Sequence, residues 1–156
     1  MMPLKQEIEL YCSLKNKPLC FAEITHDHPE WFGNAFATFD TLNIIPLFGF
    51  TPEVIAALQE LLGERTLSLV NVKDSAMFSY STQGKIPRFA PMAQHGWVKY
   101  PVPHWIPCLL YHKDLLLIHL RQRQFPPHLV VDFSHFRSHK QQQEVEVRKD
   151  QIRWAS

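Results

Sequence analysis

The chain has 156 residues, of which 46% are hydrophobic and 20% are charged, and its formal net charge is +1. This composition is that of an ordinary globular protein and excludes a largely disordered chain. A chain of this length can bury an adequate core by itself, so folding needs no metal ion or disulfide. We expect residues 1–156 to form a single domain.

Two features indicate where the protein resides. No apolar run approaches the roughly 20 residues that span a bilayer, and the first residues lack the charged-then-apolar pattern of a signal sequence. The three cysteines, Cys12, Cys20 and Cys108, include no Cys-x-x-Cys pair, which favours buried free thiols. A contact between Cys12 and Cys20 across a hairpin is the alternative. We therefore expect a soluble, cytoplasmic protein that does not bind membranes.

The amino-terminal part predicts a β-hairpin followed by a helix. Residues 8–14 alternate apolar and polar side chains, residues 15–18 have turn chemistry, and residues 19–24 are mainly apolar. Residues 31–39 carry aromatic and small apolar side chains at helical spacing, which predicts a helix with a core-packing face. Residues 43–50 are a short apolar linker to the next element.

The next element is the clearest one, a second helix over residues 51–63. Thr51 can cap its amino terminus, Pro52 suits the first helical position, and Gly63 is expected to end it in the left-handed conformation. One apolar stripe runs along this helix: Val54, Ile55, Leu58, Leu61 and Leu62. Residues 67–72 then follow as a strand.

The carboxyl-terminal half predicts mainly strands. Residues 86–107 are rich in proline and are expected to form an ordered loop with one edge strand at 97–100. The expected strands are residues 76–81, 108–111, 115–120, 129–133, 144–148 and 152–154. The fold class is therefore α+β: an N-terminal β-hairpin and two consecutive helices packed on a mostly antiparallel sheet.

The most compact candidate for chemistry is His26-Asp27-His28. Two histidines separated by one residue at the end of a strand project to the same side and can bind one metal ion. The order Thr-His-Asp-His resembles the opening of the metallo-β-lactamase motif, but Pro29 to Phe32 lack the Asp-His pair that follows there. Capping of the next helix explains the same residues, so we assign no metal site and expect no cofactor.

A second candidate is the set Asp132, His135 and His139. A helix would place these three side chains on one face, as a metal site or an acid–base group requires. Asp132 instead ends an expected strand, and a solvated turn is the alternative.

The two halves of the chain differ in charge. Residues 1–78 hold five Lys and Arg against ten Asp and Glu, a balance of −5, and residues 79–156 hold eleven against five, a balance of +6. The basic half also carries most of the nine histidines, including His104 and His119. With Arg121 and Arg123 as an anion clamp, these residues suggest a metal-independent nuclease or other phosphate-substrate enzyme, or a nucleic-acid-binding protein.

No catalytic constellation can be assigned from the sequence, so whether the protein is an enzyme stays open. The favoured function is a small binding protein of the adaptor or inhibitor (immunity) type that recognises another macromolecule, and we expect that macromolecule to be a protein. Aromatic residues on ordered loops make good interface anchors, and Arg side chains are common at interfaces. The expected partner-binding residues are Trp97, Tyr100, His104, Trp105, Arg121 and Arg123.

Overall fold

The computed structural model describes residues 1–72, 87–121, 130–131 and 145–148, with residues 119–121, 130–131 and 145–148 described by their backbone alone. The helical elements are α1 (Leu4–Lys15), α2 (Phe21–Asp27), the short 3-10 helix η1 (Pro29–Trp31), α3 (Pro52–Gly63) and α5 (Lys113–Arg121). The strands are β1 (Phe32–Phe39), β2 (Ile44–Phe50), β3 (Leu67–Asn71), β4 (His104–Trp105), β5 (Cys108–His112), β6 (Val130–Val131) and β7 (Val145–Arg148). Helices pack on mainly antiparallel strands, which confirms the α+β class.

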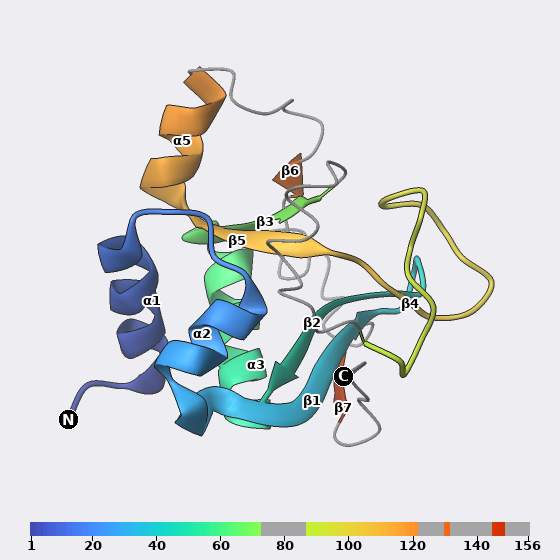
Figure 1. The fold of residues 1–156 in the computed structure, drawn as a ribbon, viewed down its shortest axis with the longest axis horizontal. Coiled ribbons are helices and arrows are strands. Elements are labelled where there is room, and N and C mark those ends of the chain that lie inside the picture. The colour runs from blue at the N-terminus through green and yellow to red at the C-terminus, as the bar shows by residue number, and fades with distance from the viewer. Residues whose placement is uncertain (73–86, 122–129, 132–144, 149–156) are drawn as a thin grey trace.

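The strands form two sheets, and Figure 1 shows them in the middle of the molecule with α1 and α2 along one side. One sheet has the order β4-β2-β1-β7, in which β1 pairs antiparallel with β2 and β7 while β2 pairs parallel with β4. The other has the order β5-β3-β6, with both neighbours antiparallel to β3. Helix α3 joins the two sheets in the chain and contacts strands of both.

Helix α3 is the element that the sequence predicts best. The Thr51 hydroxyl accepts a hydrogen bond from the Val54 N–H at 3.3 Å, and Pro52 is the first helical residue. All five residues of the apolar stripe are buried. The prediction for its end is wrong in detail, because Gly63 stays helical and Arg65 takes the left-handed conformation, with a φ of 65°. The strand predicted at 67–72 is confirmed as β3.

The predicted amino-terminal hairpin is wrong, because residues 8–14 and 19–24 lie largely in the helices α1 and α2. The buried residues of α1 are Ile8 and Cys12, which lie one helical turn apart. The apolar–polar alternation of residues 8–14 therefore does not reflect which side chains are buried. Asn16, at a φ of 51°, ends α1 in the left-handed conformation. Only Leu19 pairs with a strand, through a single bridge to Leu110.

The predicted helix at 31–39 is also wrong, because these residues form the end of η1 and the strand β1. The last five residues of β1 are all buried, so both faces of the strand are covered and the polar–apolar alternation of a half-exposed strand is absent. The expected linker at 43–50 is its partner strand β2, which is buried throughout. The register pairs Phe36 with Phe48 and Ala37 with Leu47.

The remaining predictions divide in the same way. The strand at 108–111 is confirmed as β5, and those at 129–133 and 144–148 contain β6 and β7. The strand predicted at 115–120 is wrong, since these residues lie in α5. No strand forms at 97–100; the edge pairing falls at β4, parallel to β2. The predicted strands at 76–81 and 152–154 lie outside the described residues.

The longest described helices, α1 and α3, have 12 residues each. An α-helix needs about 20 apolar residues to cross a bilayer. None of the helices in the described ranges meets that requirement.

The three cysteines are buried free thiols, as predicted. Burial raises the pKa of the Cys12 thiol to about 12 and also raises the pKa of Cys20 and Cys108 above the ordinary value, because the thiolate loses its hydration. The alternative of a contact between Cys12 and Cys20 across a hairpin is wrong, because no hairpin forms there: Cys12 lies in α1 and Cys20 immediately precedes α2.

Candidate functional site

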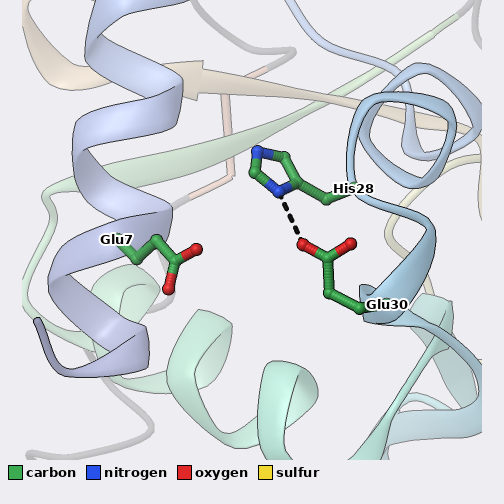
Figure 2. A group of neighbouring side chains, drawn as sticks. All are labelled: Glu7, His28 and Glu30. Carbon is green, nitrogen blue, oxygen red and sulfur yellow. Dashed lines mark hydrogen bonds and ion pairs between the residues drawn. The ribbon is translucent and has the colours of Figure 1, made fainter. Parts of the chain in front are cut away.

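The described residues bring one set of metal-binding side chains together: Glu7, His28 and Glu30. One donor atom from each of the three lies within 4.8 Å of the donor atoms of the other two. Figure 2 shows the Glu7 carboxylate projecting from α1 toward the imidazole of His28 and the carboxylate of Glu30, which come from the segment that joins α2 to β1. The three side chains therefore face a common space between two parts of the chain.

The backbone around His28 forms a tight turn. Its N–H donates to the Ile24 carbonyl at 2.9 Å and thereby closes the end of α2. Its own carbonyl accepts the Trp31 N–H at 2.9 Å and thereby closes η1, whose first residue is Pro29. This arrangement puts the side chains of His28 and Glu30 on the same side of the turn, with the His28 Nδ1 and Glu30 Oε1 atoms 2.9 Å apart.

Two aromatic side chains fix the His28 ring. It stacks on the Trp31 indole, with ring centroids 3.8 Å apart and planes 9° apart, and Trp31 is only 3% exposed. The Tyr11 ring meets His28 edge-on at 4.9 Å and Trp31 edge-on at 5.7 Å. Tyr11 lies one helical turn after Glu7, so one face of α1 supplies both a carboxylate and the packing that orients the imidazole.

A small polar network holds α1 against the end of α2. The Tyr11 hydroxyl donates to Asp27 Oδ2 at 2.7 Å, and the Lys15 ammonium lies 2.7 Å from the same oxygen. The bond from Lys15, followed by that from Tyr11, lowers the pKa of Asp27. Burial, followed by the bond to Asp27, raises the pKa of Tyr11, so the phenol stays neutral at physiological pH.

The two carboxylates of the cluster differ in their partners. The hydrogen bond with His28 lowers the pKa of Glu30. The Glu7 carboxylate is half-buried, yet within the described part of the chain it makes no hydrogen bond or ion pair. Two carboxylates thus lie close together, and none of the described residues pairs with that of Glu7.

The sequence pattern singles out His28 together with His26, whereas the structure brings His28 close to Glu7 and Glu30. His26 is exposed on α2 and does not belong to the cluster. The expected same-side projection of His26 and His28 assumed the end of a strand, whereas the structure has the end of a helix followed by a turn. Glu7 and Glu30 were missed as site residues. A hairpin strand beginning at Ile8 leaves Glu7 outside any site, whereas the helix α1 places it near His28.

The aromatic residues expected to bind a partner are only partly accessible. Trp105 is 2% exposed and Tyr100 is 7% exposed, so both belong to the core. Trp97 and His104 are half-buried. The His104 ring stacks on the Tyr100 ring at 4.4 Å, and its Nδ1 atom lies 2.7 Å from the Val102 carbonyl oxygen.

These residues lie on loop 97–105, which is held in place by hydrogen bonds on its inner side. The Tyr100 N–H donates to the Leu42 carbonyl at 3.0 Å, and the Asn43 side-chain amide donates to the Tyr100 carbonyl at 2.7 Å. The Tyr100 hydroxyl donates to the Gly96 carbonyl at 2.9 Å. Between these inward anchors, Val98 and Val102 are 44% and 53% exposed.

The histidines do not gather in one place within the described structure. His28 follows α2, and His104 begins β4; these elements are well separated in Figure 1. His119 and Arg121 lie on α5, where only the backbone is described. The other candidates of the basic half lie outside the described residues: Arg123, Asp132, His135 and His139.

No known protein family, curated protein or solved structure matches this chain. Its function is therefore inferred from the geometry of its own side chains.

Proposed function

We propose that this chain is a small, soluble, cytoplasmic binding protein without catalysis, of the adaptor or inhibitor type, and that loop 97–105 contacts another protein. The observation that supports the proposal is the outward exposure of Val98 and Val102 on a loop whose aromatic residues are anchored in the core. Tyr100 and Trp105 are buried and hold the loop on the core, while the two valines are exposed for contact with a partner.

A loop of this kind is suited to binding because its conformation is already restricted. Ordering a mobile loop at an interface costs about 0.5–1.5 kcal/mol for each immobilised side chain. Here backbone hydrogen bonds fix segment 91–106, among them one within it from Ala93 to Trp105, one from His104 to Asn43 and one from Ile106 to Ile45 of β2. The backbone of the loop is thus restricted before a partner arrives, so less of it remains to be ordered on binding.

The exposed chemistry of the loop favours a protein partner. Val98 and Val102 offer apolar contacts, and the half-buried Trp97 and His104 flank them in sequence. Lys99 is the single charged residue of the loop. Nucleic-acid surfaces are instead recognised mainly through several cations that contact phosphates.

The experiment compares partner capture by the wild-type chain and by a Val98→Asp/Val102→Asp double variant, each immobilised and exposed to extract of the native host. We expect a partner recovered in stoichiometric amount with the wild type and lost with the double variant. Leu14→Asp is the matched control, because Leu14 is an exposed leucine on α1, at 74% exposure. Circular dichroism must show that all three proteins are folded.

Equal recovery by the wild type and the double variant, or no stoichiometric partner for either, would contradict the proposal. Trp105→Ala is unsuitable for this purpose. Truncating a buried tryptophan costs about 3–5 kcal/mol, so loss of binding would report unfolding of the chain.

A further inference from the structure

We propose that Glu7, His28 and Glu30 bind a divalent cation of the late first-row transition metals, with Zn²⁺ as the representative ion. The site is separate from loop 97–105 and does not depend on the proposed protein–protein contact. It lies where α1 covers the turn between α2 and β1 (Figure 2).

The donor set determines the class of ion. Zn²⁺ is commonly bound by imidazole nitrogen and carboxylate oxygen, with three protein ligands and a water molecule as the fourth. Mg²⁺ and Ca²⁺ prefer sites made only of oxygen atoms, so the imidazole of His28 disfavours them.

The separation of the donor atoms is compatible with such an ion. Around a tetrahedral Zn²⁺ with bonds of 2.0–2.2 Å, ligand atoms lie about 3.3–3.6 Å from each other. The three donor atoms are now within 4.8 Å of one another, and the His28 Nδ1 and Glu30 Oε1 atoms are 2.9 Å apart. Binding a common ion therefore requires the two flexible glutamate side chains to adjust their rotamers, while the backbone can stay in place.

The least flexible ligand is already oriented. The stack on Trp31 and the edge contact with Tyr11 fix the plane of the His28 ring, while its Nδ1 atom is directed to the carboxylate side. Packing that fixes a ligand in this way reduces the ordering that metal binding requires.

The charges supply an independent observation. The half-buried Glu7 carboxylate lies near a second carboxylate and makes no hydrogen bond or ion pair within the described residues. The lysines of its own helix are directed elsewhere, because Lys5 pairs with Glu60 and Glu64 while Lys15 pairs with Asp27. A divalent cation would neutralise the two carboxylates.

The simpler interpretation is that His28 and Glu30 form an ion pair and Glu7 has no part in it. A substitution of Glu7 distinguishes the ion pair from the three-ligand metal site. An ion pair between His28 and Glu30 survives the substitution Glu7→Gln, whereas a three-ligand site loses one of its ligands.

The test titrates Zn²⁺ into the full chain, after treatment with a chelator, by isothermal titration calorimetry. Co²⁺ absorption in the visible range reports ligand number and geometry independently. The variants are Glu7→Gln, Glu30→Gln and His28→Phe, the last of which keeps an aromatic ring against Trp31. The matched controls are Glu9→Gln on the same helix and the exposed histidine variant His26→Ala.

We expect one Zn²⁺ per wild-type chain with saturable binding, an affinity at least tenfold lower in each ligand variant, and a change of less than twofold in the controls. Binding that Glu7→Gln leaves unchanged would overturn the three-ligand site. The absence of saturable one-to-one binding in the wild type would overturn the proposal as a whole. Glu7 and Glu30 are not in the core, so their glutamine variants are expected to fold, which circular dichroism checks.

Discussion

The imidazole of His28 lies flat against the indole of Trp31, with the two ring centroids 3.8 Å apart. Trp31 is buried, while His28 is half-buried and reaches the carboxylates of the candidate metal site. The stack thus connects the hydrophobic core directly to a titratable group near the surface. Changes to the core at this point are expected to alter both the stability of the fold and the order of His28.

Replacing Trp31 by alanine removes the surface on which His28 stacks. We expect the free energy of unfolding to fall by about 3–5 kcal/mol, as for other large buried aromatic residues. Trp31→Phe should cost less, because a ring still fills part of the space. Urea unfolding monitored by circular dichroism gives both values. A decrease in the free energy of unfolding below about 1 kcal/mol for Trp31→Ala would show that the Trp31 side chain is not closely packed in the core.

The cap of α3 provides a prediction of smaller size. The Thr51 hydroxyl accepts a hydrogen bond from the Val54 N–H, which otherwise has no partner in the first turn of the helix. Thr51→Ala is therefore expected to lower the free energy of unfolding by about 1 kcal/mol, and Thr51→Ser, which keeps the hydroxyl, by much less. Equal effects of the two substitutions in urea unfolding would assign the loss to the methyl group and not to the cap.

The same helix shows which parts of the fold were accessible from sequence. Its cap, its first-turn proline and its apolar stripe all indicate one structure, so α3 was predicted correctly. β1 was not, because a strand buried on both faces has no alternation and its phenylalanines happen to fall at helical spacing. In α1 the apolar–polar alternation of residues 8–14 is typical of a strand, although the two residues that are buried, Ile8 and Cys12, have helical spacing.

The candidate metal site was only partly accessible for a related reason. His28 was recognised, since local sequence placed it beside another histidine. Glu7 joins it only through the packing of α1 against the segment after α2, and no local pattern encodes that contact. Likewise, the sequence shows that residues 100 and 105 are aromatic, but their burial depends on contacts distant in sequence. Trp105 is held by the pairing of β4 with β2, and Tyr100 by hydrogen bonds with Leu42 and Asn43.

The buried thiols and phenols predict how stability changes at alkaline pH. Burial raises the pKa of Cys12 to about 12 and that of Tyr111 to about 12, and it raises those of Cys20, Cys108 and Tyr11 as well. The folded state therefore keeps protons that the unfolded state releases. These protonated groups contribute fully to the free energy of unfolding below the unfolded thiol pKa of about 8.5. The contribution is lost as the pH rises toward the raised pKa values of the folded state.

The free energy of unfolding should accordingly be unaffected by these groups from pH 7 to 8 and decline from about pH 8.5 upward. Each fully titrating thiol contributes at most about 1.4 kcal/mol per pH unit to this decline. Urea midpoints measured from pH 7 to 10 test it, and the thiols should react with a thiol reagent at pH 8 only after unfolding. A constant midpoint, or rapid reaction of the native protein, would contradict the burial of the cysteines.

Two glycines allow a paired test of the backbone. A methyl group on Gly33 would lie 2.8 Å from the Phe50 carbonyl oxygen and 2.9 Å from Thr51 Cα, both of them backbone atoms that cannot rotate away. Gly33 lies where the register between β1 and β2 shifts, next to the junction of β2 and α3. A methyl group on Gly63, the last residue of α3, meets no atom within 4 Å.

We therefore expect opposite signs from the same chemical change. Gly33→Ala should lower the free energy of unfolding by about 1–3 kcal/mol, because the two strands must move apart. Gly63→Ala should raise it by about 0.5–1 kcal/mol, since Gly63 is helical and alanine restricts the unfolded chain. Urea unfolding of both variants decides the matter. Destabilisation by Gly63→Ala would mean that this residue takes the left-handed conformation after all, and a neutral Gly33→Ala would contradict the close approach of β1 to residue 50.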